Sequence, residues 1–272
     1  MLLRIEKKRL LELAPFTQRA FKTALKQHLF ESAVQSLPQD DGSSFTFERI
    51  VGSPTGTYDS QTEVKIRDGS YEYEDDHWYV VFANQELGGG YLNQGFVQEE
   101  ILTIECPEVA IALSQFNWLG PLGQNEVGIY TNVDRGCQIL IYGRQRVGAK
   151  GNLKEAIQRV PPKRIHLLAM NAINVSKKRE GATREDLRYM LDKAVIGFRA
   201  VVERGGQEIQ TGKWGCGVYG NDLLSITMIT ILAARKAGLS RVVFYLYDGS
   251  GREIVEECMK LSSTQIEERL FG

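Results

Sequence analysis

Two adjacent glutamates and a run of three glycines are the residues of this sequence that could do chemistry together. Glu99 and Glu100 follow Gly88-Gly89-Gly90 closely and lead into the apolar run Ile101 to Ile104. Glycine lets backbone N–H groups turn toward a ligand in conformations that a Cβ would forbid, and such a nest of donors suits a phosphate oxygen. A carboxyl group can protonate the departing oxygen of a glycoside and then activate water. The layout therefore indicates a glycoside-cleaving site for a phosphorylated sugar.

The adjacency of the two glutamates divides their roles. Neighbouring residues point to opposite faces of a strand and about 100° apart on a helix, so Glu99 and Glu100 cannot do the same task. One would sit at the scissile bond while the other grips sugar hydroxyls or holds the loop. On these residues alone the alternative also stands, that the glycine run is a flexible turn and the glutamates are a solvated pair.

A strand and a second glycine loop are expected to position these groups. Trp78 to Phe82 is an aromatic and β-branched run that is apolar at nearly every position, as a buried strand should be. Far downstream, glycines between Gly215 and Gly220 would let the backbone approach a diphosphate closely. The helix expected over Leu223 to Ala237 would point its N-terminus, with free N–H donors and a partial positive charge, toward the anion.

Composition narrows the class of protein. The 272 residues suit one α/β domain with an added helical segment, or at most two small domains. A net charge of −1 leaves no polycationic footprint, so we expect no general nucleic-acid binding. We also expect no signal peptide, no membrane span, no bound metal and a monomer inside the cell. The cysteines are scattered, as reduced thiols would be: Cys106, Cys137, Cys216 and Cys258.

The N-terminal part is expected to be a helical accessory segment, residues 1–44, ahead of a catalytic domain over 45–272. Apolar residues recur at three- and four-residue steps over residues 4–36, and Pro15 is expected to divide two helices. Residues 37–44 read as a linker. Short strands and polar turns alternate from Phe45 to Phe82. Further along we expect a helix starting at Pro107, strands over Gln138–Tyr142, Ile165–Ala172 and Arg241–Gly249, a helix over Arg184–Val202, and a closing helix over 251–272.

Two separate strings resemble one known family. Phe82-Ala83-Asn84, the three glycines and Val97-Gln98-Glu99-Glu100 resemble the signature of the poly(ADP-ribose) glycohydrolases. Thr211 to Asp222 is similar to the second glycine loop of that family, with Lys213 where an asparagine is usual. The similarity covers roughly Asp59 to Gly249.

The resemblance implies a fold and a reaction. The fold would be a macrodomain-like three-layer α/β/α arrangement with a mixed central sheet. The reaction would be hydrolysis of the ribose–ribose O-glycosidic bond of poly(ADP-ribose), releasing ADP-ribose without a cofactor. Glu100 would be the catalytic acid, and Glu99 would hold ribose hydroxyls with Asn84 beside it. The implied partners are ADP-ribose or poly(ADP-ribose) and ADP-ribosylated proteins.

The resemblance also implies a set of substrate-binding residues. Glu74, or else Glu72, would accept a hydrogen bond from the adenine amino group, and Tyr247 would pack beside the nucleotide. Tyr219 could pack on a ribose or merely wedge its loop. The full set is Asn84, Gly88, Gly89, Gly90, Gln98, Glu74, Gly215, Cys216, Gly217, Val218, Tyr219, Gly220 and Tyr247.

Three departures from the family pattern concern the substrate more than the chemistry. Val81 stands where the family usually has aspartate, and Lys213 either adds a direct cation or is a surface substitution. Gly148-Ala149 aligns with the place of a tyrosine that covers the adenine. Two alternatives therefore remain open, a hydrolase of mono-ADP-ribosyl linkages on proteins and a non-catalytic ADP-ribose-binding module.

Overall fold

The computed structural model describes the whole chain except residues 39–41, 55–58, 117–120, 137, 140–156 and 159. The strands are β1 (Leu2–Glu6), β2 (Ser44–Val51), β3 (Glu63–Asp68), β4 (Trp78–Ala83), β5 (Glu126–Arg135), β6 (Gln138–Ile139), β7 (Ile157–Gln158), β8 (Lys163–Asn171), β9 (Glu208–Gly212) and β10 (Arg241–Leu246). The helices are α1 (Lys7–Leu11), α2 (Ala14–Ala20), α3 (Ala24–Ser36), α4 (Gln98–Glu105), α5 (Pro107–Gln115), α6 (Arg184–Glu203), α7 (Leu223–Ala237), α8 (Arg252–Met259) and α9 (Ser263–Phe271).

A mixed sheet of eight strands forms the middle of the molecule, in the order β1-β2-β5-β8-β4-β9-β10-β3. The pairs from β1 to β8 are antiparallel. From β8 to β3 every pair is parallel. The carboxyl ends of five strands therefore meet at one edge, which is where open α/β sheets bind their ligands.

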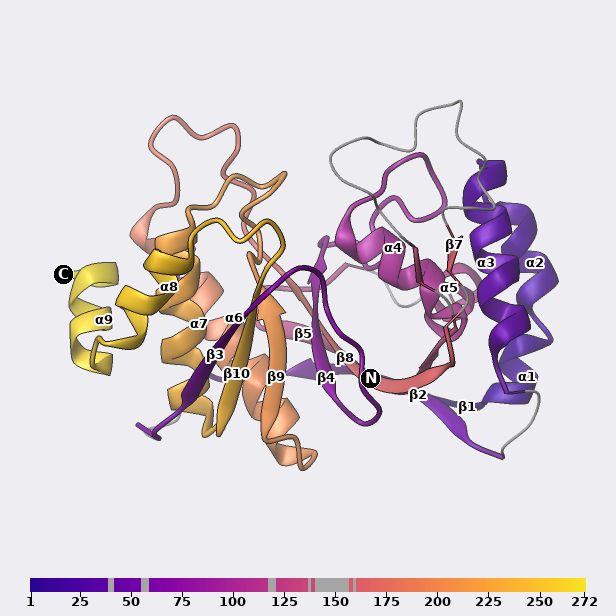
Figure 1. Ribbon diagram of the computed structural model, residues 1–272, viewed down its shortest axis with the longest axis horizontal. Coiled ribbons are helices and arrows are strands. Elements are labelled where there is room, and N and C mark those ends of the chain that lie inside the picture. Colours follow the sequence, from indigo (N-terminus) through magenta and orange to yellow (C-terminus); the bar gives the residue numbers. More distant parts are fainter. Residues whose placement is uncertain (39–41, 55–58, 117–120, 137, 140–156, 159) are drawn as a thin grey trace.

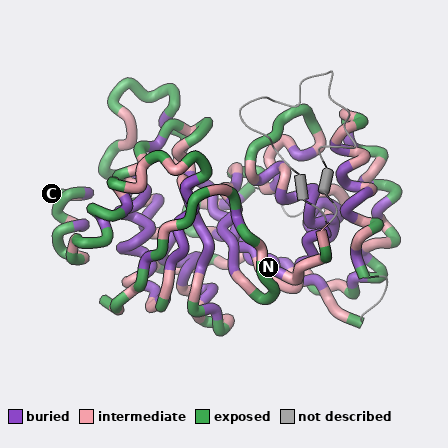
Figure 2. Tube along the Cα trace, in the orientation of Figure 1, coloured by how far each residue is buried: buried purple, intermediate pink, exposed green. Residues whose placement is uncertain are grey.

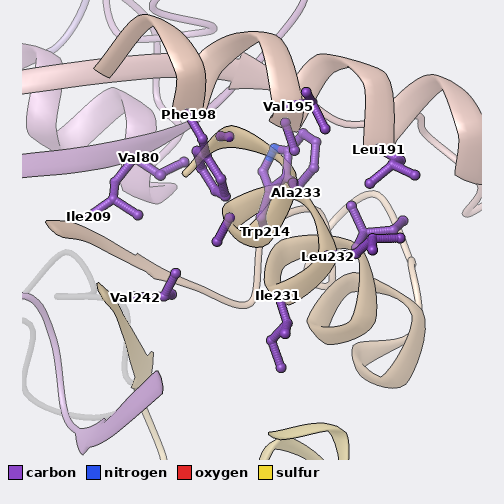
Figure 3. Packing of buried hydrophobic residues seen from close by; sticks show 14 of the residues in the cluster. Val80, Leu191, Val195, Phe198, Ile209, Trp214, Ile231, Leu232, Ala233 and Val242 are labelled. Atoms are coloured by element: carbon purple, nitrogen blue, oxygen red, sulfur yellow. The ribbon is translucent and has the colours of Figure 1, made fainter. Parts of the chain in front are cut away.

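Helices cover both faces of this sheet, which makes the expected three layers (Figure 1). The strand β4 has no polar face because both of its faces are buried: Val80 packs in the cluster with α6 and α7, while Tyr79 and Val81 pack in the cluster with α1 to α5. Figure 3 shows the first of these clusters, where Phe198 of α6 and Trp214 lie against α7 and the sheet. In Figure 2 the buried residues follow the strands and the inner helix faces, and the exposed ones gather on the connecting loops.

Several predicted elements are confirmed. The helix α7 has the expected bounds, and α6 ends one residue beyond its prediction. Pro15 stands in the first turn of α2 and Pro107 in the first turn of α5, positions that need no backbone N–H donor. Among the described residues, no helix has the length and apolarity that crossing a bilayer requires.

Other expectations differ from the structure. Residues 4–6 are not helical, because Leu2–Glu6 pairs antiparallel with β2 as the edge strand of the sheet. The closing segment is two helices, α8 and α9, not one. Of the strand expected over Gln138–Tyr142, β6 is described and Leu140 to Tyr142 lie outside the described residues. The division of the chain at residue 44 stays a prediction.

Candidate active site

The acid pair lies in the first turn of α4, directly after the loop that leaves β4. The side chain of Asn84 begins this loop by accepting the N–H of Glu86 at 3.1 Å, which turns the chain away from the sheet. Gly88 has φ +84° and Gly89 φ +51°, conformations that side chains with a Cβ rarely adopt. The loop then returns to α4, so the glycines and the glutamates face each other.

Glu99 is held by the loop itself. Its side chain accepts the N–H of Asn84 at Oε2 and the N–H of Gly88 at Oε1, both at 2.7 Å. The residue is 3% exposed. Burial raises the pKa of Glu99 to about 8, and the nearby charge of Glu100 adds to this, although the two N–H donors favour the carboxylate. The glutamate that does not act at the scissile bond is expected either to grip sugar hydroxyls or to hold the loop. The contacts of Glu99 match the second of these roles.

Glu100 points to the other side of the loop. Its Oε1 accepts the N–H of Gly90 at 3.1 Å, and its Oε2 lies 3.3 Å from the ammonium of Lys26 on α3. The loop also wraps the carboxylate further along, since a Cβ at Gly95 would collide with it. Neighbouring residues of one helix turn thus have different donors, as their angular separation requires.

These contacts change the expected use of the first glycine loop. The N–H groups of Gly88 and Gly90 are taken by the two glutamates, and that of Gly89 donates to the carbonyl of Glu86 at 3.0 Å. The expected nest of phosphate donors therefore binds carboxylates in this structure. The loop fixes the acid pair rather than presenting free donors to an anion.

Gln98 fastens α4 to the sheet. Its side-chain amide accepts the N–H of Phe82 at 3.0 Å and donates to the carbonyl of Val80 at 3.1 Å. β4 pairs with β9 at Tyr79 and Gln210. Directly after this pair, the Gln98 amide is the hydrogen-bond partner of backbone groups of β4. Both ends of the amide are thus used to position the helix that carries the acids, and its contact with substrate stays a prediction.

The second glycine loop, residues 213–220, offers free donors. Within the described part of the chain, the N–H groups of Gly217, Val218 and Tyr219 have no hydrogen-bond acceptor. Gly217 and Val218 are exposed and Tyr219 is half-buried. Successive amides of a turn that lack acceptors are available to an anion. This loop, more than the first one, has the properties that a diphosphate requires.

The two glycine loops follow neighbouring parallel strands, β4 and β9, and so begin at the same edge of the sheet. The charge of Glu99 acts on the Tyr219 hydroxyl and, after burial, is the second cause that raises the pKa of that group. Two hydrogen bonds hold the second glycine loop. The carbonyl of Tyr219 accepts the N–H of Val175 at 2.9 Å, and the Asn221 amide donates to the carbonyl of Ile173 at 2.8 Å. The backbone of the loop is thus fixed to the segment that follows β8.

Lys213 joins two loops at the carboxyl edge. Its ammonium lies 2.7 Å from Oδ1 of Asp248 and 2.6 Å from Oγ of Ser250. The pKa of Asp248 is held below its usual range by hydrogen bonds from Lys213 and Ser250. The lysine is therefore a tie between the second glycine loop and the turn after β10.

The N-terminus of α7 is less free than the sequence suggests. The side chain of Asp222 caps the helix by accepting the N–H of Ser225 at 2.8 Å. A carboxylate at this position offsets the positive end of the helix dipole. Cys216, in the same loop, is half-buried, and burial raises the pKa of its thiol to about 12.

The predicted nucleotide-side residues divide into two groups. Tyr247 follows β10 at the carboxyl edge and is 56% exposed, as a platform for a ligand should be. Glu74 lies near the other edge, because its carboxylate is 3.6 Å from Nε2 of His77, the residue before β4. It lines a cavity of about 190 Å³ with residues along β3, β9 and β10. Figure 1 shows the segment between β3 and β4 running down from one edge to the other. The structure does not bring Glu74 to the glycine loops. Glu72 lines the same cavity.

Asp68, at the end of β3, lies at the carboxyl edge of the sheet. It is registered with Leu246 of β10 and contacts Nη2 of Arg252 at 2.9 and 3.0 Å. A Cβ added to Gly249 would lie 3.7 Å from its Oδ1. Val81 is buried within β4, whereas Gly148-Ala149 lies outside the described residues.

Comparison with known proteins decides the family of this fold and site. The family model described as poly(ADP-ribose) glycohydrolase (PARG), macro domain fold, matches residues 56–252. This chain belongs to the poly(ADP-ribose) glycohydrolase family. Poly(ADP-ribose) glycohydrolase 1 of Caenorhabditis elegans is 27% identical to it over 194 residues. That match covers 67% of this family member and 24% of the relative, so the chain spans less than a third of the relative's length.

Solved structures of the glycohydrolase family have the same fold. The poly(ADP-ribose) glycohydrolase of Thermomonospora curvata superimposes with a TM-score of 0.53 at 18% identity, over 97% of this chain and 99% of that one. The same enzyme bound to the inhibitor ADP-HPD gives 0.54 at 18% identity, over 92% and 98%. The macrodomain-like fold expected from the sequence is thereby confirmed.

Lys26 is the residue of this glycohydrolase-family site that the sequence did not predict. A signal was available, because Lys26 shares one helix stripe with Leu29, Phe30 and Ala33 at three- and four-residue spacing, and all three are buried. A lysine on a buried stripe needs a partner. The position of that partner, far along the chain, could not be read from spacing.

Proposed function

We propose that this chain hydrolyses the ribose–ribose O-glycosidic bond of poly(ADP-ribose) and releases ADP-ribose. The observation that carries the proposal is the pair of buried carboxylates, Glu99 and Glu100, held by the first glycine loop. The second glycine loop, with N–H groups that have no acceptor among the described residues, follows the neighbouring parallel strand at the same edge of the sheet. Family membership supports the same reaction. A binding module would gain nothing evident from burying two carboxylates beside a sugar.

Glu100 carries the proton in this mechanism. Its carboxyl group would protonate the oxygen that leaves, as the bond to the anomeric carbon breaks and an oxocarbenium-like state develops. The resulting carboxylate would then take a proton from the water that attacks this carbon. One group can do both tasks because the two steps are separated in time.

Glu99 fixes the first glycine loop relative to α4, the helix that carries Glu100. Both of its carboxylate oxygens already accept backbone N–H groups from Asn84 and Gly88. Contact with ribose hydroxyls would have to share these oxygens or replace one donor. We therefore assign Glu99 mainly to the geometry of the loop, with Asn84 as the residue through which the end of β4 is tied to it.

The diphosphate would lie on the second glycine loop, with the nucleoside along the carboxyl edge toward β10 and β3. The free amides of Gly217, Val218 and Tyr219 support the first placement. The exposed ring of Tyr247 supports the second, since an aromatic face is a platform for a base or ribose. On this path Asp68, rather than Glu74, is positioned to accept the adenine amino group.

The test compares wild type with Glu100→Gln on two labelled substrates, automodified poly(ADP-ribose) and a panel of mono-ADP-ribosylated proteins. Wild type should shorten the polymer and release ADP-ribose, while Glu100→Gln should lose at least about a hundredfold in rate and still bind ADP-ribose. Glu86→Gln, an exposed carboxylate in the same loop, is the matched control and should keep the wild-type rate.

Other outcomes would change the assignment. Release from the mono-modified panel alone would make the chain a hydrolase of mono-ADP-ribosyl linkages. If neither substrate is cleaved while ADP-ribose still binds, the chain is a non-catalytic binding module. An unchanged rate in Glu100→Gln would contradict the mechanism while leaving the activity standing.

A further inference from the structure

The N-terminal helical segment reaches into the acid pair through one side chain. The ammonium of Lys26 on α3 lies 3.3 Å from Oε2 of Glu100 and 3.1 Å from the carbonyl oxygen of Gly90. It also lies 5.1 Å from the centroid of the Phe96 ring. Lys26 is 0% exposed, so no bulk water competes for these contacts. Three parts of the chain, α3, the first glycine loop and α4, thus meet at one ammonium group.

The same loop is fastened to the N-terminal segment at two further points. The N–H of Lys22 donates to the carbonyl of Leu92 at 2.9 Å. The rings of Phe21 and Tyr91 meet edge to face, with centroids 6.1 Å apart and an interplanar angle of 87°. The glycine loop is therefore fixed between α4 on one side and the connection from α2 to α3 on the other.

A buried ammonium and a buried carboxylate that lie in contact stabilise each other. Burial alone disfavours both charges, and each charge favours the other. Burial lowers the pKa of Lys26, and the charge of Glu100 opposes this. Among the described residues, Lys26 is the one cation in contact with Glu100, so its loss would leave the carboxylate with the Gly90 N–H as its remaining donor.

The other charged groups around α4 are engaged elsewhere. Glu99, on α4 itself, is bound by backbone N–H groups, and β4 carries no charged side chain. The remaining charged side chains of α3, α5 and α4 have their own partners: His28 with Glu31, Glu108 with Lys7, and Glu105 with Arg135. The hydroxyl of Tyr91, in the first glycine loop, donates to the carbonyl of Ala110 at 3.3 Å.

We propose that Lys26 is a positioning residue for the reaction, whose ammonium holds the Glu100 carboxyl in place from outside the sheet and its loops. The proposal rests on Glu100 being the catalytic acid of the function proposed above. It makes the N-terminal segment part of the active site rather than an accessory layer. The segment supplies no group to the bond being cleaved, and it acts through Glu100.

The charge of Lys26 is what the test must isolate. Removing an opposite charge from the side of a carboxylate disfavours its ionised form. The limb of the pH–rate profile that Glu100 sets should therefore move to higher pH in Lys26→Met and Lys26→Gln. Lys26→Arg keeps the charge and should keep the limb near its wild-type position. Lys26→Gln also retains a donor for the Gly90 carbonyl, in case Lys26→Met does not fold.

A second buried lysine of the same segment is the matched control. Lys7 lies 2.5 Å from Asp134 and 3.4 Å from Glu108, away from the acid pair. Lys7→Met removes a buried ammonium at a comparable structural cost, yet it should leave the pH limb in place. A shift in both variants would point to loosened packing rather than to a specific pairing, and would overturn the proposal.

Carbon-13 NMR of the glutamate carboxyls tests the role of Lys26 independently of whether the chain cleaves poly(ADP-ribose). The Glu100 signal, assigned by its absence in Glu100→Gln, should titrate at higher pH in Lys26→Gln than in wild type. This measurement works even if wild type cleaves no substrate, in which case the proposed function fails and the pairing is still tested. A Glu100 signal that titrates at one pH in wild type, Lys26→Gln and Lys26→Arg would refute the role of Lys26.

Discussion

The backbone N–H of Gly88 donates to Oε1 of Glu99 at 2.7 Å, so the first glycine loop is closed on the acid pair. Gly88 can point this donor inward because its φ is +84°, in the left-handed region. A Cβ there would meet Cδ1 of Leu113 at 2.8 Å and Cδ1 of Tyr91 at 2.9 Å. The glycine is therefore required both by its backbone conformation and by the packing under the loop.

Gly88→Ala should lower the free energy of unfolding by about 2 kcal/mol or more, from left-handed strain together with overpacking. Activity should fall with it, because the strained backbone at position 88 would no longer aim its N–H at Glu99. Gly217→Ala is the control for stability, since a Cβ added to Gly217 would meet nothing within 4 Å. Urea denaturation of the three proteins measures the difference. Equal stability of Gly88→Ala and wild type would mean that the loop is not held as described.

The ionisation of Glu99 should make stability depend on pH. Its pKa is about 8 in the folded protein against an ordinary 4.5, so the folded state binds the extra proton between these values. Stability should therefore be highest below about pH 4.5 and fall as the pH rises toward 8, by at most about 1.4 kcal/mol per pH unit. Glu99→Gln should flatten this fall in denaturation curves taken from pH 5 to 8.5.

Glu108 is the necessary comparison for that experiment. Burial raises the pKa of Glu108 to about 7. Its ionisation therefore also lowers the free energy of unfolding as the pH rises, but this decrease ends near pH 7. Glu108→Gln should flatten the lower part of the window and leave the part near pH 8 unchanged. If Glu99→Gln has the same pH dependence as wild type, Glu99 is already ionised in the folded protein at pH 5.

The position of Asp68 predicts how adenine is recognised. Asp68→Ala removes an acceptor at the carboxyl edge and should weaken ADP-ribose binding about tenfold, the value of one hydrogen bond to a charged group. Its effect on stability should be small, since the pair with Arg252 is exposed. Calorimetric titration gives the affinity. An analogue with unsubstituted purine in place of adenine lacks the amino group and should bind wild type and Asp68→Ala alike.

Glu74→Ala is the control that separates the two acids. Glu74 lies beside His77 near the other edge of the sheet, so its loss should leave ADP-ribose affinity unchanged. The opposite result, with Glu74→Ala weak and Asp68→Ala normal, would restore the expectation drawn from the sequence.

The sequence predicted best those elements whose patterns agree with their environment. β4 is apolar throughout because both faces are covered, and α7 has a capping Asp222 at its start and Gly238, with φ +80°, at its end. β5, in contrast, had no prediction. Its register shifts between Tyr130 and Val133, and Asn132 has φ +57°, so the alternation that marks a strand is broken.

The site was predictable in its residue types but less so in its contacts. Adjacency alone implied different roles for Glu99 and Glu100, and the structure gives them different donors. Spacing could not tell that the N–H groups of the glycines turn toward these acids. It also could not place Glu74, because the chain from β3 to β4 crosses from one edge of the sheet to the other. Lys26 depends on a contact between segments that are far apart in the chain.

Tyr247 gives a last prediction, on the aromatic side of the same edge. Its ring is 56% exposed directly after β10, so it contributes little to the core and is available to a ligand. Tyr247→Ala should weaken ADP-ribose binding about two- to tenfold, as the loss of one aromatic contact does, with an unchanged melting temperature. Tyr247→Phe keeps the ring and should bind as wild type does. If Tyr247→Phe is as weak as Tyr247→Ala, the hydroxyl rather than the ring face makes the contact, and the nucleoside does not stack at this position.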